Sequence, residues 1–333
     1  MTRIAFGLLL WLCASLALSA DPPDYTITDV GPCGGQILAV NDHGQVAGSY
    51  SGGQLVTRGF LWTQGKRADL GLLPQYTSTI VCAINNRGQI AGNLDATTDG
   101  AVLTIVSHAF LWKRGKLHDL TAPSGDEVSV AAAMNDGGQV VGYASAIGRP
   151  SDDNLSLTEH HAFVCKGGVM TDLGPGEAKA INTGGQIVGE TPGPFYLEAT
   201  LWDHGRVIKL GIHGIAQAIN NSGQILIDTG NSSPVLWQHG HLRFLPVPPG
   251  SVEALAHGIN DRGQIIGTVS VGQNSQAALW QGNRVLDLNT RISPHSGWVL
   301  TDATGINNRG QIVGHGFFHG KESAFLLTPL RKG

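Results

Sequence analysis

The sequence predicts an all-β fold, a closed seven-bladed β-propeller with four antiparallel strands in each blade. One phrase, typified by Ala83-Ile84-Asn85-Asn86-Arg87-Gly88-Gln89-Ile90-Ala91-Gly92, recurs seven times. Its copies lie 38 to 50 residues apart, which is near the length of one four-stranded blade. The other phrases of the repeat complete seven blades only when the first strand of the chain joins the last blade. The anchoring asparagines are Asn41, Asn85, Asn135, Asn182, Asn220, Asn260 and Asn307.

The inner two strands of each blade flank a tight turn. In the second copy, the apolar run 80–84 is predicted to face the central channel. Asn85 to Gly88 then reverse the chain, because asparagine bonds its own backbone two residues on and glycine accepts a left-handed conformation. Residues 89–92 form the next strand, in which polar positions alternate with apolar or small ones.

The outer half of each blade is predicted by two further phrases. An aromatic and apolar phrase forms the third strand, with copies at 59–62, 108–112, 161–165, 199–202, 235–237, 277–280 and 324–327. A glycine usually follows within a few residues and supplies the next hairpin turn. The fourth strand is short and ends in Asp-Leu or a related pair, with copies at 69–70, 119–120, 172–173, 209–210, 244–245 and 287–288.

The two ends of the chain predict how the ring closes. Those six outer phrases leave one blade incomplete, and a seventh outer phrase stands near the amino terminus at 28–31. At the other end the chain stops soon after a third-strand phrase, and Pro329 lacks the N–H that a further strand needs. We therefore expect the first strand to complete the last blade, which removes the exposed edges of an open stack.

Composition predicts an exported, soluble protein. Residues 1–20 combine Arg3, an apolar run and a small-residue end, the layout of a cleaved signal peptide. Residues 21–333 should then form a single propeller domain, because a ring of repeats folds as one unit. The net charge is −4 and only 14 % of residues are charged, which favours neither nucleic acid nor an anionic membrane surface. No stretch after the signal approaches eighteen apolar residues, so no membrane insertion is expected. We expect a secreted or periplasmic monomer.

Three cysteines remain after signal cleavage. Cys33 and Cys82 both precede a repeat phrase, so they are the better candidates for one disulfide; the alternative is that both are free thiols. Cys165 stands where other copies of the third strand carry tryptophan, and we interpret it as a buried apolar substitute.

Candidate site residues fall in three predicted long loops, at about 95–107, 144–160 and 289–302, all on one face of the ring. The middle loop carries Arg149, Asp152, Asp153, Asn154, Glu159 and His160. Paired carboxylates with amide oxygens suit calcium, so Asp152 and Asp153 are possible metal ligands. The alternative is a solvated polar loop without a cofactor.

The last loop carries Arg291, His295 and Trp298, a set that suits a sugar ring; the alternative is that Trp298 plugs the channel. His108 and His161 share one repeat position and are interpreted as structural. The glutamine of each phrase could form a ring that binds a glycan, although hydrogen bonds within each blade explain its recurrence more simply.

The phrases resemble the HAF family of extracellular repeat proteins. His108-Ala109-Phe110 and His161-Ala162-Phe163 are copies of the tripeptide that names the family, and the carboxy-terminal run from Gly297 is similar to its usual ending. The resemblance covers essentially the whole mature chain and implies export and a repeat fold without a general catalytic activity. The chain departs from the pattern at Cys165 and at Ile227, which replaces a glycine.

The leading functional hypothesis is a binding or scaffold protein whose ligand is an extracellular glycan or protein. Asp152, Asp153, Asn154, Arg291 and Trp298 are its candidate ligand-binding residues. The alternative is a polysaccharide-active, lyase-like enzyme with acid and base groups on the long-loop face. Its candidate residues are His160, Glu159, Arg149, Tyr196 and His295. A purely structural surface protein is the third hypothesis.

Overall fold

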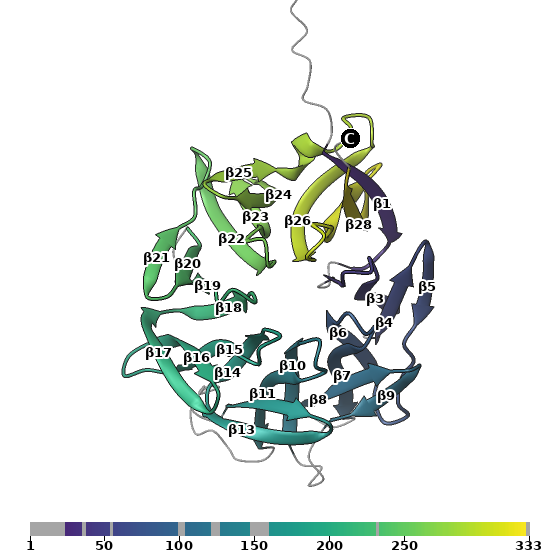
Figure 1. The fold of residues 1–333 in the computed structure, drawn as a ribbon. Coiled ribbons are helices and arrows are strands. Elements are labelled where there is room, and N and C mark those ends of the chain that lie inside the picture. The colour runs from purple at the N-terminus through teal and green to yellow at the C-terminus, as the bar shows by residue number, and fades with distance from the viewer. Residues whose placement is uncertain are drawn as a thin grey trace, which may run out of the picture.

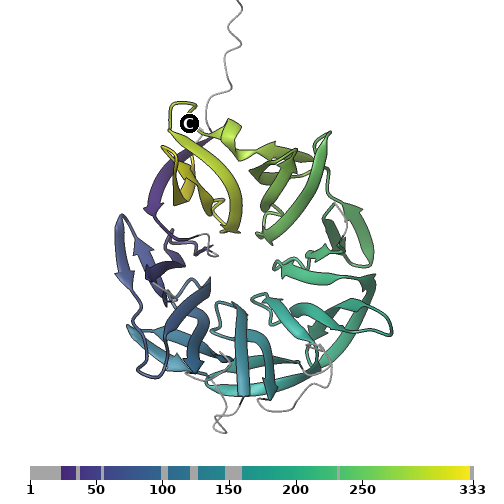
Figure 2. The same ribbon diagram turned by 180° about the vertical axis from the view of Figure 1, so that it is seen from behind.

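The protein is a ring of seven four-stranded antiparallel sheets (Figure 1). The computed structural model describes residues 24–34, 38–53, 56–98, 104–120, 127–146, 160–230 and 233–330. The sheets stand around a central axis like the blades of a propeller, and Figure 2 shows the same ring from the opposite face. The predicted seven-bladed β-propeller is confirmed. The predicted signal peptide and the residues 147–159 of the middle loop lie outside the described residues.

The first four blades follow one another along the chain, each built from inner to outer strand. Blade one is β2 (Ala39–Val40), β3 (Val46–Gly53), β4 (Val56–Thr63) and β5 (Lys66–Asp69). Blade two is β6 (Ser78–Ile84), β7 (Ile90–Thr98), β8 (Thr104–Lys113) and β9 (Lys116–Asp119). Blade three is β10 (Glu127–Met134), β11 (Val140–Ala146), β12 (His161–Lys166) and β13 (Val169–Pro175). Blade four is β14 (Glu177–Ile181), β15 (Ile187–Pro192), β16 (Leu197–Asp203) and β17 (Arg206–His213).

The last three blades bring the chain back to its start. Blade five is β18 (Ile215–Ile219), β19 (Ile225–Asp228), β20 (Val235–Gln238) and β21 (His241–Phe244). Blade six is β22 (Ser251–Ile259), β23 (Ile265–Val271), β24 (Asn274–Gln281) and β25 (Arg284–Asp287), followed by the 3-10 helix η2 (Leu288–Arg291). Blade seven is β26 (Trp298–Ile306), β27 (Ile312–Phe318), β28 (Lys321–Pro329) and β1 (Tyr25–Gly31).

The first strand completes the last blade, as predicted. β1 pairs antiparallel with β28 from Tyr25 opposite Pro329 to Gly31 opposite Ala324. The N–H of Leu330 also donates to the carbonyl of Asp24 at 2.8 Å. Chain segments about three hundred residues apart thus share one sheet, and the ring is closed by backbone hydrogen bonds.

The repeated asparagine forms the predicted turn. In blade two, the N–H of Gly88 donates to the carbonyl of Asn85 at 3.0 Å, and Gly88 has a φ of 69°. The Oδ1 atom of Asn85 accepts the N–H groups of Arg87 and Gln89, both at 3.0 Å. Side chain and backbone therefore hold the same reversal.

The asparagines also join neighbouring blades, a role that their turn-forming character did not predict. Each Nδ2 group donates to the backbone carbonyl of the asparagine in the next blade, at 2.7 to 3.2 Å. The seventh bond, from Asn307 to Asn41, closes the circle at 2.7 Å. All seven side chains are buried. We call these seven residues the asparagine ring.

The repeated glutamines bond within their own blades. Each Oε1 atom accepts from the asparagine that opens its phrase, for example from Asn85 to Gln89 at 2.8 Å. Gln45 and Gln311 also donate to threonines on the third strand, Thr63 and Thr328. The interpretation of these glutamines as within-blade partners is confirmed.

The third-strand phrases supply the core between blades. The phenylalanines of four copies, Phe60, Phe110, Phe163 and Phe325, are at most 2 % exposed. Cys165 is also 2 % exposed and packs with Phe163 in the same cluster, which confirms it as a buried apolar substitute.

Two of the three predicted long loops need correction. The predicted loop 95–107 consists largely of strand, since β7 runs to Thr98 and β8 begins at Thr104. The predicted loop 289–302 contains most of η2 and the start of β26. A hairpin can extend beyond the sheet core when its polar residues pair across it, and the bond from Ser107 to Asp95 does so here.

Cys33 and Cys82 do not form a disulfide, so that proposed pairing is wrong. The Cys33 side chain is buried in a core cluster of blades one and seven, with its Sγ atom 3.1 Å from Nδ1 of His315. Cys82 lies on an inner strand instead, where its thiol is hydrogen-bonded to the carbonyls of Ala91 and Ala131.

Candidate functional site in the central channel

A β-bulge recurs at the same position of six inner strands. It lies three residues before the asparagine of each phrase, where one extra residue interrupts the pairing with the second strand. A bulge redirects a side chain out of the regular alternation. We call the six extra residues the bulge residues: Cys82, Ala132, Lys179, Gln217, His257 and Thr304. In blade one the corresponding Leu38 is buried in the core.

The bulge residues line one cavity in the channel. Its volume is about 480 Å³, and all six of them contribute to its wall. Asp228 and Asp302 add carboxylates to the same wall. The bulge thus directs one residue of each of these inner strands toward a shared cavity, and the chemistry of that residue differs from blade to blade.

Lys179 is part of a charged cluster between blades three and four. Its Nζ atom lies 2.5 Å from Oε2 of Glu177 and 3.5 Å from Oε1 of Glu190. Glu177 and Glu190 stand directly opposite each other on β14 and β15. Two carboxylates in such a pair repel each other, and the positive charge of Lys179 between them offsets this repulsion.

His160 and Tyr143 complete this cluster from blade three. Nδ1 of His160 is 2.6 Å from Oε1 of Glu177, and the imidazole ring stacks on Tyr143 with ring centroids 4.4 Å apart. Glu177 is therefore held by two partners, whereas the Oε2 atom of Glu190 is buried without any.

The two carboxyl groups differ in proton affinity for this reason. Burial raises the pKa of Glu190, and the charge of Glu177 adds to that effect. Burial alone would also raise the pKa of Glu177, but its hydrogen bonds from Lys179 and His160 outweigh burial and lower it. One carboxyl group is thus stabilised as the anion and its neighbour as the acid.

A second charged pair lies on the channel wall at blades six and seven. Nε2 of His257 is 3.3 Å from Oδ1 of Asp302, which also accepts a hydrogen bond from Thr268. Burial would raise the pKa of Asp302, but the bonds from His257 and Thr268 outweigh it and lower the pKa. The carboxylate can therefore orient the imidazole next to the cavity.

The thiol on the cavity wall is unreactive. Burial raises the pKa of the Cys82 thiol to about 12, so it stays protonated and unreactive at neutral pH. Among the described residues, no group of three His, Cys, Asp or Glu side chains is placed to hold a metal ion.

The opposite end of the channel is lined by the asparagine ring and by the residue that follows each asparagine. These following residues bond around the circle as well, for example from the N–H of Asn86 to Oδ1 of Asp136 at 2.8 Å. Asp42, Asp136 and Asp261 are all partnered in this way. That end of the channel is held together by hydrogen bonds between neighbouring blades.

The site residues predicted from sequence are spread over several places. His160 belongs to the cluster around Glu177. Tyr196 is exposed on the hairpin between β15 and β16, where its ring contacts His213, and His295 is exposed after η2. Neither lines the channel cavity. Arg149, Asp152, Asp153, Asn154 and Glu159, and with them the possible calcium site, lie outside the described residues.

Arg291 and Trp298 occupy different surroundings. Arg291 lies in η2 and its Nη1 atom is 3.5 Å from Oδ2 of Asp24. The Trp298 ring stacks on Phe318, with centroids 5.0 Å apart, and packs in a core cluster of blades six and seven. It borders a surface hollow of about 720 Å³ but does not line the channel cavity, so its interpretation as a plug is wrong.

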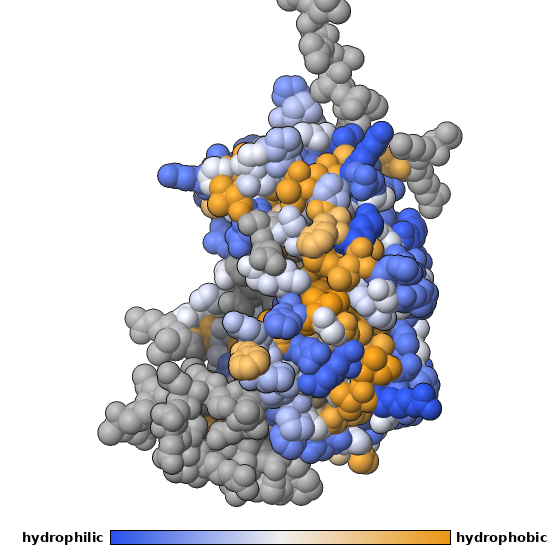
Figure 3. All heavy atoms as spheres, turned by 90° about the vertical axis from the view of Figure 1, so that its left-hand side faces the viewer, coloured by the Kyte–Doolittle hydropathy of each residue, from blue (hydrophilic) through white to orange (hydrophobic). Residues whose placement is uncertain are grey.

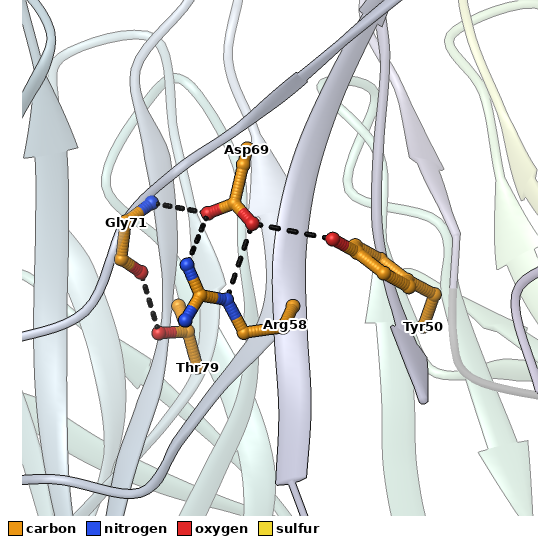
Figure 4. A network of polar contacts seen from close by, with 5 residues as sticks. All are labelled: Tyr50, Arg58, Asp69, Gly71 and Thr79. Atoms are coloured by element: carbon orange, nitrogen blue, oxygen red, sulfur yellow. Dashed lines mark hydrogen bonds and ion pairs between the residues drawn. The ribbon is translucent and has the colours of Figure 1, made fainter. Parts of the chain in front are cut away.

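His108 and His161 form a recurring polar contact with the outer strand. Each Nδ1 atom lies close to an aspartate eleven residues on, at 3.1 Å for Asp119 and 2.8 Å for Asp172. In blade one the same two positions hold Arg58 and Asp69, joined by two hydrogen bonds, while Tyr50 and Gly71 also donate to that carboxylate (Figure 4). The contact ties the third strand to the fourth and supports a structural role for both histidines.

Sequence reasoning missed Lys179, His257, Asp302 and Glu190. Lys179 and His257 could have been found from the position three residues before each asparagine. In the six blades with a bulge, that position holds six different residue types, and its neighbours in the strand are small or apolar. Asp302 and Glu190 carried no such signal, because only the folded strands bring them beside their partners.

Comparisons with known proteins support the fold alone. No protein-family model matches the chain, and no curated protein matches it. The propeller domain of the trilobed protease of Pyrococcus furiosus is similar with a TM-score of 0.58 at 11 % identity, over 89 % of this chain and 94 % of that one. YCF48 bound to the D1 peptide gives 0.54 at 10 % identity, over 94 % and 97 %.

A puromycin-hydrolysing peptidase of Mycobacterium tuberculosis is similar with a TM-score of 0.56 at 13 % identity, over 92 % of this chain. The match covers 52 % of that peptidase, so the chain spans about half its length, as it does for the acylaminoacyl peptidase of Pyrococcus horikoshii. In the part of the chain that the structure describes, no helix is long and apolar enough to cross a membrane.

Proposed function

We propose that the protein is an exported binding protein of the HAF type, whose ligand, an extracellular glycan or protein segment, enters the central channel. The observation that carries this proposal is the contrast within each inner strand. The flanking residues repeat from blade to blade, whereas the bulge residues that line the cavity are Cys, Ala, Lys, Gln, His and Thr. A repeat that only had to fold would not need six chemistries at one position.

The cavity suits a polar ligand. Gln217 and Thr304 offer neutral hydrogen-bonding groups, while Lys179 and the pair of His257 and Asp302 offer charged ones. The ring around them is closed and rigid, so the ligand meets groups that are already placed. YCF48, a similar propeller, has a known structure with a bound peptide, which supports a protein segment as a ligand for this fold.

The test is direct binding to panels of glycans and of envelope-protein peptides, followed by titration of any hit against channel variants. Gln217→Ala and His257→Ala should each weaken binding at least tenfold, because each removes a group from the cavity wall. Arg309→Ala, exposed on a turn at the other end, is the matched control and should bind normally. Equal binding by all variants would remove the channel from the proposal.

An acid–base enzyme acting on polysaccharides is the second candidate, favoured by Glu177 and Glu190. Two carboxyl groups whose pKa values are moved apart are what acid and base catalysis requires. Release of new chain ends from polysaccharides, lost in Glu177→Gln and Glu190→Gln but retained in Arg309→Ala, would support it. Ligand binding without any turnover over pH 4 to 9 would leave binding as the function.

A further inference from the structure

Exposed apolar side chains gather on one sector of the ring. Among the described residues, twelve large hydrophobic side chains are exposed, and eight of them lie between residues 195 and 252. They belong to blades four and five, to the segment that follows β21 and to the start of β22 in blade six. Figure 3 looks at this side of the ring, where apolar residues form a band across the outer wall. The eight are Phe195, Tyr196, Val207, Ile208, Leu242, Phe244, Val247 and Val252.

The same two blades depart from the repeat in their outer strands. The outer strand of every other blade carries an aspartate at the position of Asp69, whereas blade four has Lys209 there and blade five has Phe244. The outer strands β17 and β21 contain Arg206, Lys209 and Arg243 but no acidic residue. Lys209 forms an ion pair with Glu198 of the neighbouring strand β16, at 2.9 Å, so the exposed Arg206 is the cation of β17 that is left for a partner.

An apolar hollow adjoins β17. It has a volume of about 550 Å³ and lies between blades three and four, lined mainly by Leu173, Pro175, Pro192, Trp202 and Val207. The indole N–H of Trp202 donates to the carbonyl of Leu173 at 3.2 Å, so the floor of the hollow is fixed by a bond between the blades. Lys209 stands at its rim.

The outer strand β17 offers an unpaired backbone edge beside this hollow. Arg206 to Lys209 pair with β16 on one side only, because β17 ends the sheet order of blade four. An exposed edge with apolar side chains and no proline is a template for another strand. The bulge that begins after Lys209 limits the template to about four residues.

We propose that this outer wall binds an extended, acidic segment of another protein, which pairs with β17 and places an apolar side chain in the hollow beside Val207. Backbone pairing supplies the direction, the hollow supplies the anchor, and an acidic residue of the segment meets Arg206. The choice of an acidic partner follows from charge complementarity, since Arg206 is exposed and makes no ion pair among the described residues, whereas Lys209 already pairs with Glu198. This surface is separate from the channel, so the proposal does not depend on the proposed function.

The probe is a synthetic nine-residue peptide in which glutamate alternates with leucine, titrated into the full chain by calorimetry. We expect binding that weakens as salt rises. Arg206→Glu should weaken it at least tenfold. Arg284→Glu is the matched control, because Arg284 is exposed at the same position of the outer strand of blade six, and it should bind as the unmodified protein does. Val207→Glu, checked for folding by urea denaturation, should also weaken binding.

Three results would overturn the proposal. The first is no binding of the acidic peptide, or binding that Arg206→Glu and Arg284→Glu reduce equally. The second is undiminished binding when a proline replaces the central leucine, because proline cannot donate to the edge. The third is a dimer in sedimentation that Arg206→Glu dissociates, which would assign the wall to a second copy of this chain.

Discussion

The two ends of the channel are built on opposite rules. At the asparagine ring seven identical side chains make the same bond to the next blade all the way round. At the bulge residues no two side chains are alike, and their polar groups face a cavity. The repeated asparagines hold the blades together at one end of the channel. The bulge residues at the other end are therefore free to vary.

Removing one member of the asparagine ring should have the largest effect. Asn307→Ala deletes donors to Asn41 and Gln311 and an acceptor for two turn N–H groups, all in a buried place. At about 1 kcal/mol for each bond, we expect the free energy of unfolding to fall by about 4 kcal/mol. Urea denaturation measures it, with exposed Arg309→Ala as the control. A loss under about 1 kcal/mol would show that the ring does not hold the blades together.

Lys179→Met tests whether a bulge residue can also be structural. It leaves Glu177 and Glu190 facing each other in a buried place without their cation. Removing one partner of such a buried pair costs about 3 kcal/mol, and we expect a loss of that order at pH 7. Thermal and urea unfolding of the variant against Gln217→Ala give the comparison. Equal stability of the two variants would mean that Lys179 serves the cavity alone.

The pH dependence of Glu177→Gln and Glu190→Gln should have opposite signs. Glu177 has a lowered pKa, so it stabilises the fold above its ordinary value of 4.5, and that stability is lost as the pH falls. Glu190 has a raised pKa, so its ionisation costs stability as the pH rises. Relative to the unmodified protein, Glu177→Gln should be less stable at pH 7, and Glu190→Gln should gain stability from pH 4 to pH 8. Parallel curves for the two variants would contradict the assignment.

The smallest effect on stability is expected at a neutral bulge residue. Gln217→Ala removes a side chain that borders the cavity and makes no hydrogen bond that the fold depends on. Its free energy of unfolding should change by less than about 0.5 kcal/mol, as for other substitutions away from the core. Urea denaturation checks this. A larger loss would place the bulge residues with the asparagine ring as structural elements.

Most of the fold was predictable because it repeats. The asparagine turn at Asn85, the third-strand core at Phe110 and the completion of the last blade by β1 all follow from phrases that recur. The partner of each asparagine in the next blade did not follow, because a turn residue does not reveal which carbonyl its Nδ2 group meets.

The candidate site was less predictable for a physical reason. Lys179 was visible as a departure within its strand, but its importance depends on Glu190, which lies across the sheet at a position without a repeat signature. Two of the predicted site residues, Tyr196 and His295, lie on exposed segments away from the channel cavity. A bulge, which needs one extra residue in a strand, is hard to recognise before the pairing is known.

Pairing of β1 with β28 has a mechanical consequence. Asp24 and Leu330 are joined by a hydrogen bond, so whatever is attached to either end pulls on the same blade. An attachment at either end of the chain therefore holds the ring through blade seven. Blade four, which carries Arg206 and Val207 on its outer strand, lies on the opposite side of the ring (Figure 1). A protein attached to a surface through its ends would present the outer strand of blade four on the side away from that surface.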